Sequence, residues 1–490
     1  MESGSNRGRS DMKPERIRLL ESQAESLRRE IHFLHRWREQ RTYTASWHVF
    51  RALFAVEVWL NRKIRGWTGS SGGPAPLTPM RRMAGALPDV ALAEQGIAAK
   101  ALPISVSQPT RLLIDVTATV KMDPHTGIQR VVKSLVAEFY RSQAQHPFLR
   151  PVAVRLEGKM LVSCENFVAS LLVSPATGAE APISIAAGDR LLMLADSWRD
   201  FDSFAPVFRE VRSKGGAVFT CVYDLIPVLL PAVTWGDTPE VHERWLRSSA
   251  ALCDGMIAIS RTVADEIAEF FREHEVPHRP GLKIGWFHCG SDLPPRRTSV
   301  VRDAVKTGFG PPQRTFLAVG TIEPRKGYDV LLAAFDRLWS SGFDARLVIF
   351  GRPGWYVEGI VASICTHAEF GRRLFWFKDG NDAELDYAYS RTDAVICASY
   401  AEGFGLPIAE AARRDRPVIA SDIPVFREVG GEGVAYFRVN DPDALAEIVR
   451  RWSAGEIRTD PAKVSRSSWA DAAQRVCEII TRDDWYRELN

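Results

Sequence analysis

Two glutamates, Glu402 and Glu410, stand eight positions apart in the stretch SYAEGFGLPIAEAARRDRPVIAS. An apolar run, AVICAS, precedes them, and Gly403, Gly405 and Pro407 lie between them. Glycine lets backbone amides approach a ligand, and proline favours the first position of a helix. We therefore expect a strand, then a loop, then a helix that begins at Pro407 and has Glu410 in its first turn. Carboxylates accept hydrogen bonds and repel phosphate, so they suit the hydroxyls of a ribose or a hexose. For Glu410 the alternative is compensation of the helix dipole.

A second junction of the same kind carries the opposite charge. The run RTFLAVG ends at Gly320, and Arg325 and Lys326 directly precede the apolar segment GYDVLLAAF. Two cations beside a helix N-terminus combine fixed charge with free N–H groups, which predicts an anion site suited to a diphosphate. The alternative is a solvated charge pair on a loop. Together with the two glutamates, the pattern favours a nucleotide-sugar site.

A third junction, DVTATVKMDPHTGIQR, is less specific. Gly127 stands where a helix is expected to begin, with His125, Gln129 and Arg130 beside it. A glycine there lets a phosphate or sugar approach the backbone, although a single glycine most often marks only a turn.

Short β-branched runs alternate with helical patterns from about residue 110 onwards. Expected strands of a first series are 111–118, 189–196, 217–225 and 255–260, and those of a second series are 314–320, 346–351, 374–379, 394–399 and 417–421. Such alternation predicts parallel sheets covered by helices on both faces. In this class of sheet, ligands lie beyond the carboxyl ends of the strands. We therefore expect an α/β protein with two doubly wound, Rossmann-like domains that meet near residues 290–312.

These motifs resemble glycosyltransferase family 4, a family of retaining enzymes with the two-domain GT-B fold, in which the domains face each other across a cleft. GTIEPRKGYDVLLAAF is similar to the family's diphosphate-binding segment, and AEGFGLPIAEAARRDRPVIASDIPVFREVGGEGVAYF is similar to its E-x7-E signature. The resemblance implies that Glu410 binds the ribose and Glu402 the transferred sugar. It also implies that the amides of Phe404, Gly405 and Leu406 serve the sugar and the phosphates.

The resemblance covers residues 110–480. DGNDAELDYAYSRTDAVICAS fits the segment whose start, Gly380 to Asp382, touches the nucleobase, and SSWADAAQRVCEII fits the final helix, which returns to the first domain. Catalytic roles are implied for Arg325, Lys326 and Glu402, and no metal is expected, because no D-x-D motif ends a strand. The implied donor-binding set is Gly127, Gly320, Arg325, Lys326, Gly380, Asp382, Glu402, Gly403, Phe404, Gly405, Leu406 and Glu410.

The N-terminal half looks like a bacterial branch that includes mannosyltransferases of O-antigen and other surface polysaccharides. The similar motifs are LLIDVTATVKMDPHTGIQRVVKSL and VYDLIPVLLP. Many family members carry a histidine before the aspartate of the second motif, whereas this sequence has Tyr223 before Asp224. The histidine's role in holding the donor sugar does not transfer to Tyr223, and His125 and His288 are other candidates.

The N-terminal extension has a character of its own. Residues 1–66 carry 14 Lys and Arg against 8 Asp and Glu, which makes this segment +6, although the whole chain is only +3. A heptad pattern runs through residues 15–41, and residues 44–67 form an apolar, tryptophan-rich segment with a basic end. The first pattern indicates a coiled coil or a docked amphipathic helix, and the second an interfacial membrane helix or a helix buried against protein.

The expected domain organisation follows from these patterns. It comprises a helical extension at 1–67, a flexible linker at 68–109, a Rossmann-like acceptor domain at 110–298, a Rossmann-like nucleotide-sugar domain at 299–465, and a returning helix at 466–490. Seven scattered cysteines without a C-x-x-C pair indicate reduced thiols. No run of about 20 apolar residues is present and the first residues are polar, so neither a membrane span nor a signal peptide is expected.

The sequence therefore predicts a retaining hexosyltransferase at the inner face of the bacterial cytoplasmic membrane, where it is a peripheral protein of the cytoplasm. The expected donor is GDP-mannose, with a UDP-sugar as the alternative, and no further cofactor is expected. The expected acceptor is a saccharide or lipid-linked saccharide of O-antigen or lipopolysaccharide synthesis. Residues 15–67 would contact membrane, a second copy or a pathway enzyme, and no nucleic acid is expected. Two alternatives stay open: a nucleotide-sugar epimerase or hydrolase of GT-B fold, and an inactive glycosyltransferase-like scaffold.

Overall fold

The structure of the chain is a computed structural model. It describes residues 110–123, 126–143, 149–175, 178–292, 300–310 and 313–489. The heptad segment, the tryptophan-rich segment and the linker lie outside the described residues. The expectations about them stay predictions.

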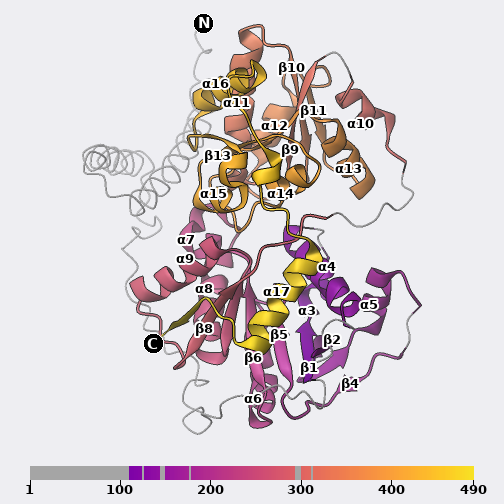
Figure 1. Ribbon diagram of the computed structural model, residues 1–490, viewed down its shortest axis with the longest axis vertical. Coiled ribbons are helices and arrows are strands. Elements are labelled where there is room, and N and C mark those ends of the chain that lie inside the picture. Colours follow the sequence, from indigo (N-terminus) through magenta and orange to yellow (C-terminus); the bar gives the residue numbers. More distant parts are fainter. Residues whose placement is uncertain are drawn as a thin grey trace, which may run out of the picture. The chain divides into compact units, whose positions relative to one another are not determined.

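Within the described residues, the first sheet has nine strands in the order β15-β8-β7-β6-β5-β1-β2-β3-β4 (Figure 1). Neighbours from β8 to β2 are parallel, whereas β3, β4 and β15 pair antiparallel. The strands are β1 (Thr110–Asp115), β2 (Leu149–Glu157), β3 (Met160–Ser163), β4 (Pro182–Ile183), β5 (Arg190–Met193), β6 (Ala217–Val222), β7 (Gly255–Ala258), β8 (Leu282–Trp286) and β15 (Arg487–Leu489).

The second sheet is fully parallel and, in the described part of the chain, has the order β11-β10-β9-β12-β13-β14. Its strands are β9 (Arg314–Val319), β10 (Ala345–Phe350), β11 (Leu374–Phe377), β12 (Ala394–Cys397), β13 (Val418–Ser421) and β14 (Ala435–Phe437). The strand order reverses between β9 and β12. This arrangement is the doubly wound Rossmann topology, in which ligands bind at the reversal point.

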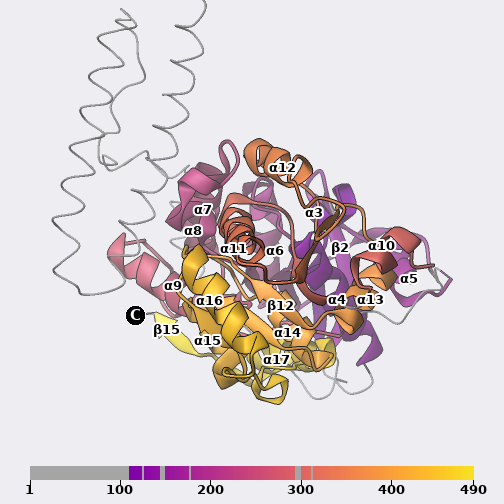
Figure 2. The same ribbon diagram turned by 90° about the horizontal axis from the view of Figure 1, so that it is seen from above.

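Helices connect the strands of both sheets. They are α3 (Thr117–Lys121), α4 (Gly127–Arg141), α5 (Glu165–Leu172), α6 (Ala205–Ser213), α7 (Ile226–Leu229), α8 (Thr238–Leu252), α9 (Arg261–Glu273), α10 (Asp303–Gly308), α11 (Tyr328–Ser340), α12 (Glu358–Cys365), α13 (Asp382–Arg391), α14 (Leu406–Arg413), α15 (Pro424–Gly430), α16 (Pro442–Ser453) and α17 (Trp469–Arg482). Figure 2 shows α11 and α16 side by side, and they pack together.

Both faces of the second sheet are buried. Consecutive residues of β9 point to opposite sides: Phe316 joins the cluster that includes α11 and α16, whereas Leu317 joins the cluster that includes α14. Because strand side chains alternate, a strand covered on both faces must be apolar throughout. The short apolar runs of the sequence therefore meet this requirement, and the α/β fold class with two Rossmann-like sheets is confirmed.

The last described segment returns to the first sheet. Helix α17 packs against α4, and β15 pairs with β8 (Figure 1). The Trp469 amide donates to the Asp292 carboxylate at 2.8 Å, which fixes the start of α17 beside the segment that follows β8.

Several strands are shorter than the sequence suggested. The strand expected at 111–118 ends at Asp115, because the Asp115 carboxylate accepts from the amide of Thr117 at 3.0 Å and turns the chain into α3. The strands expected at 189–196 and 217–225 end at Met193 and Val222. In each case the apolar run continues into the loop beyond the sheet edge, so hydrophobicity alone does not mark the end of the strand.

The seven cysteines are all free in the structure. Among the described residues, no helix is both long and apolar enough to cross a membrane.

Candidate functional site

The centre of the site is the reversal point between β9 and β12. Gly320 follows β9 with φ +143°, and a short 3₁₀ turn over Pro324–Lys326 leads into α11. Ser399 to Gly405 follow β12 and lead into α14. The structure therefore brings the two glycine-rich junctions found in the sequence to the same edge of one sheet.

Glu402 lies between the two cations predicted to bind diphosphate. Its Oε2 accepts from Nη1 of Arg325 at 2.9 Å, its Oε1 pairs with Nζ of Lys326, and the Ser399 hydroxyl donates to it at 2.8 Å. Burial alone would raise the pKa of Glu402, but Lys326 and Arg325 lower that pKa to about 2. Glu402 is thus ionised throughout the neutral range.

Arg325 also has a second carboxylate partner, which sequence reasoning did not select. Its Nε lies 2.9 Å from Oε2 of Glu323, a buried residue of the EPRKG motif. Burial would lower the pKa of Arg325, but Glu323, Glu402 and Asp224 raise it. Because both cations are paired with carboxylates, a diphosphate can engage them only by sharing or displacing these partners.

The geometry requires glycine at two positions of the loop. A Cβ on Gly403 would lie 2.0 Å from the backbone oxygen of Tyr223, and one on Gly405, where φ is +98°, would lie 2.8 Å from Phe426. Steric contact alone therefore demands both glycines. Gly127, the first residue of α4, lies beside this loop, since a Cβ there would sit 4.0 Å from Leu406.

The side chain of Phe404 belongs to the core. It is 3% exposed and packs edge-on against His288 with ring centroids 5.4 Å apart. Only its backbone is left to face a ligand, and the role expected of its amide stays a prediction. The helix itself begins at Leu406 rather than Pro407, so the expectation of proline at the first position was wrong by one residue.

Glu410 lies deeper than expected. It is the fifth residue of α14, not part of the first turn, because the helix leaves the loop before the acidic residue is reached. The side chain is buried, accepts from the Tyr389 hydroxyl at 2.6 Å, and pairs with Arg130 of α4. Burial and Glu410 together raise the pKa of Tyr389. Compensation of the helix dipole does not account for Glu410, because the residue lies beyond the first turn. A ribose would have to share the Glu410 carboxylate with Arg130.

Tyr223 does not take the place of the histidine usual in the family. Its hydroxyl donates to the Leu194 carbonyl at 2.6 Å inside the first sheet's core. His288 is held by Glu428 at 2.8 Å and by Ser465 at 3.1 Å. His125 lies outside the described residues, so its candidacy stays a prediction.

Two further residues join the second domain to the start of α9, and neither was selected from the sequence. The Ser260 hydroxyl donates to the Gly403 carbonyl at 2.7 Å. Glu428 of α15 accepts from the amides of Arg261 and Thr262 at 2.8 and 2.7 Å, which caps the N-terminus of α9. Ser260 is the N-cap of α9, and a serine before an amphipathic run is a signal that could have identified that helix start, although not its long-range partner.

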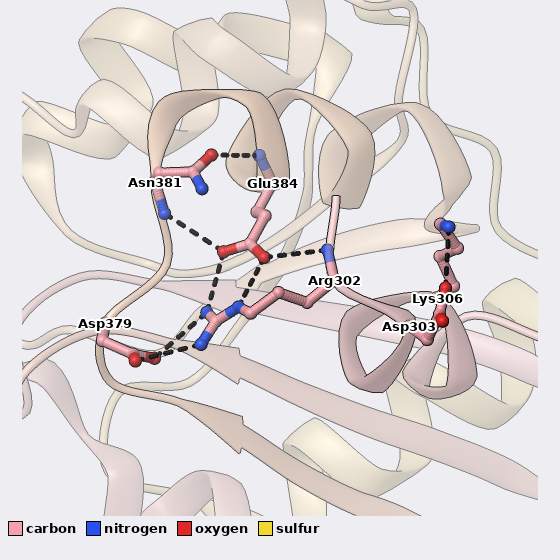
Figure 3. Close-up of polar contacts among 6 residues, drawn as sticks. All are labelled: Arg302, Asp303, Lys306, Asp379, Asn381 and Glu384. Atoms are coloured by element: carbon pink, nitrogen blue, oxygen red, sulfur yellow. Dashed lines mark hydrogen bonds and ion pairs between the residues drawn. The ribbon is translucent and has the colours of Figure 1, made fainter. Parts of the chain in front are cut away.

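Gly380 and Asp382, predicted to lie near the nucleobase, follow β11, which is separated from β9 by β10. Figure 3 shows how this turn is fixed: Arg302 binds Asp379 at 3.0 Å and Glu384 at 2.6 Å. Burial would raise the pKa of Glu384, but Arg302 lowers it. Asp382 itself is exposed at the start of α13. The turn is thus rigid, and Gly380 lies against Phe350, where a Cβ would come within 2.7 Å.

The described residues contain no group of three or more His, Cys, Asp or Glu side chains that could hold a metal ion. The site is thus built from two cations, their carboxylate partners, and the amides of a glycine loop.

Two Rossmann-like sheets, with such a cluster at the strand-order reversal of the second, agree with the GT-B fold expected from the motifs. Residues 302–474 match the family described as Glycosyl transferases group 1. Residues 302–474 are therefore a group 1 glycosyltransferase domain, which confirms the glycosyltransferase resemblance of the motifs.

Named relatives are similar to a larger part of the chain. The serotype-specific mannosyltransferase WbdA of Escherichia coli is 31% identical over 358 residues, which is 70% of this chain and 41% of WbdA. The chain thus spans about two fifths of the length of that relative. The O-antigen chain mannosyltransferase RfbU of Salmonella typhimurium is 26% identical over 234 residues, 47% of this chain and 59% of RfbU. The crystal structure of Anabaena HepE with UDP-glucose has a TM-score of 0.46 at 14% identity, and covers 76% of this chain and 97% of HepE.

Proposed function

We propose that the protein is a retaining hexosyltransferase that moves mannose from GDP-mannose onto a lipid-linked or growing bacterial surface polysaccharide. The observation that carries the proposal is the partly buried cluster of Arg325, Lys326 and Glu402 at the strand-order reversal, beside a glycine loop. The named mannosyltransferase relatives WbdA and RfbU support mannose as the sugar. A UDP-sugar is the alternative donor.

In the proposed reaction, Lys326 and Arg325 exchange part of their contact with Glu402 for the donor's diphosphate. The bond between the sugar's anomeric carbon and the phosphate oxygen breaks as the acceptor oxygen bonds to the same face of that carbon. The acceptor's proton passes to the departing phosphate oxygen. The two cations stabilise the negative charge that develops on the leaving group, which is the contribution expected of preorganised positive charge in a buried site.

Glu402, freed in part from the cations, accepts hydrogen bonds from hydroxyls of the transferred sugar. Glu410 binds the ribose together with Arg130, and the amides of Gly405 and Leu406 serve the phosphates. Positive charge from Arg325 and Lys326 can neutralise the diphosphate, so the proposal includes transfer without an obligatory metal ion.

The proposal extends to cellular location. We place the enzyme at the inner face of the cytoplasmic membrane, where its lipid-linked acceptor would lie, and assign the membrane or partner contact to residues 15–67. The net charge of +6 over residues 1–66 supports attraction to anionic lipid.

The test is thermal stabilisation of the purified full chain by a panel of nucleotide sugars, with and without EDTA. A ligand that binds only the folded state at a hundredfold excess over its Kd adds about 2.7 kcal/mol of stability. We expect a selective rise in Tm with GDP-mannose that survives EDTA and is lost in Glu410→Ala. A rise in Tm with a UDP-sugar alone would identify that sugar nucleotide as the donor in place of GDP-mannose. No rise with any nucleotide would favour the scaffold alternative, and consumption of donor that is independent of acceptor would favour a hydrolase.

A further inference from the structure

The first sheet has a strand-order reversal of its own, which the proposed donor site does not use. Strand β1 has β2 on one side and β5 on the other, and β5 is followed by β6. These strands end at Asp115, Met193 and Val222. In open parallel sheets, the carboxyl edge at such a reversal is where ligands bind.

Asp196 lies at this edge, three residues beyond β5, and is partly exposed. Its two carboxylate oxygens lie 3.3 and 3.4 Å from Nε2 of Gln129, which is at the long end of hydrogen-bonding distance. Burial raises the pKa of Asp196, whereas its own amide and Gln129 lower it. A carboxylate can accept about four hydrogen bonds, so Asp196 retains acceptor capacity at the sheet edge.

Asp115 at the same edge differs in this respect. It is fully buried and accepts from the Thr117 amide at 3.0 Å and from the Ser197 hydroxyl at 2.7 Å. These bonds fix the course of the chain, since they anchor the loop that carries Asp196. Trp198 anchors the loop on its other side, with its ring 4.8 Å from that of His242. The Asp196 side chain is therefore presented from a fixed loop, as a binding residue must be.

Two sets of contacts link Asp196 to the proposed donor site. Gln129 contacts Asp196, and the next residue, Arg130, pairs with Glu410. On the other side, Asp196 is close enough to Tyr223 to help burial raise the tyrosine's pKa, and the Tyr223 carbonyl faces Gly403. Asp196 thus lies near both α4, which contacts α14, and Tyr223, which contacts the glycine loop.

We propose that Asp196 binds a hydroxyl of the acceptor saccharide at the reversal point of the first sheet and so selects the acceptor. This inference rests on the proposed transferase function. A hydroxyl donor fits Asp196 because the carboxylate carries negative charge and weak internal partners, and because a sugar held there would adjoin the glycine loop from the first-sheet side. Asp196 is a specificity-determining residue in this account, and the charge on the leaving phosphate is handled by Lys326 and Arg325.

The experiment uses the full chain with GDP-mannose as donor, and with α-linked mannobiose and its monodeoxy analogues as acceptors. For Asp196→Asn we expect the KM for mannobiose to rise about 10- to 100-fold, the range for loss of a hydrogen bond to a charged group. Stabilisation by GDP-mannose should stay unchanged. One deoxy analogue should be a poor acceptor for the wild type, yet equal to mannobiose for Asp196→Asn. The control is Asp202→Asn, a carboxylate whose side chain is 48% exposed.

An unchanged KM and unchanged analogue discrimination in Asp196→Asn would overturn the inference and leave the transferase function standing. Loss of donor stabilisation in the same variant would also overturn it, because Asp196 would then act on the donor. If Asp196→Asn lowers Tm markedly, Asp196→Glu supplies the second test: the charge is kept, and we expect altered preference among the analogues. Preference identical to the wild type would contradict the inference. If the wild type transfers mannose to none of the saccharides, the proposed function fails and the inference falls with it.

Discussion

The ion pairs of Glu402 make a quantitative prediction about stability. The pKa of Glu402 is about 2, compared with 4.5 for an ordinary glutamate. Since each pKa unit corresponds to about 1.4 kcal/mol, the ionised form stabilises the fold by about 3 kcal/mol at neutral pH. The substitution Glu402→Gln keeps the shape but removes the charge between Arg325 and Lys326. We therefore expect the free energy of unfolding at pH 7 to fall by about 3 kcal/mol.

The same linkage fixes the pH dependence. Because the folded-state pKa lies below the unfolded value, the stabilisation is complete above about pH 5 and is lost as pH falls from 4.5 towards 2. The difference between wild type and Glu402→Gln should therefore shrink by about 1 kcal/mol between pH 7 and pH 3.5. Urea unfolding followed by tryptophan fluorescence at both pH values measures this difference, and effects of other carboxylates cancel because both proteins contain them.

The matched control is Glu432→Gln, since the Glu432 side chain is 86% exposed and paired only with Lys463 in the described contacts. Exposed pairs contribute little, so this variant should unfold like the wild type at both pH values. The reasoning is refuted if Glu402→Gln is as stable as the wild type at pH 7. It is also refuted if the difference between the two proteins is the same at pH 3.5 as at pH 7.

Three other predictions concern the site and the extension. Lys326→Ala should lower turnover about 10²- to 10³-fold with little change in acceptor KM, because the lost cation acts on the leaving group; turnover like that of Lys306→Ala would count against this. Gly403→Ala should abolish stabilisation by GDP-mannose, since its Cβ would lie 2.0 Å from the backbone oxygen of Tyr223. The control Gly359→Ala, whose Cβ would meet nothing within 4 Å, should bind GDP-mannose normally. Equal binding by both variants would exclude a role for the glycine loop in donor binding. Removal of residues 1–68 should leave an active protein that no longer sediments with membranes, and membrane retention would place the anchor in the catalytic body.

Local motifs made the second sheet and its junctions predictable. Arg325 and Lys326 stand within a few residues of the end of β9, and Glu402 within a few of the end of β12, so a strand-to-helix pattern was enough to place them at one sheet edge. Apolar runs identified most of the parallel strands, although β2, β8 and β14 were not among those expected. Strands β2, β3 and β4 were not expected, because β2 mixes polar and apolar residues, and β3 and β4 are only four and two residues long.

Contacts between distant segments could not be predicted. The pairs Arg130–Glu410 and Ser260–Gly403 each join residues far apart in the chain, and nothing local in either partner indicates the other. The Glu402 ion pairs belong to the same class: the residue types suggested separate tasks for cations and carboxylate, whereas the fold places them in contact. The buried hydroxyl of Tyr223 likewise depends on the packing of β6 against the loop after β5.

The most direct test of the central claim is the product itself. Full-length protein is incubated with GDP-mannose and a mannose-terminated saccharide, and the new anomeric proton signal is followed by NMR from the first turnovers. The account predicts GDP release coupled to a new α-mannosidic linkage, with the configuration of the donor retained. A β-linkage would contradict the retaining mechanism, and release of GDP and free mannose at the same rate with and without saccharide would contradict transfer altogether.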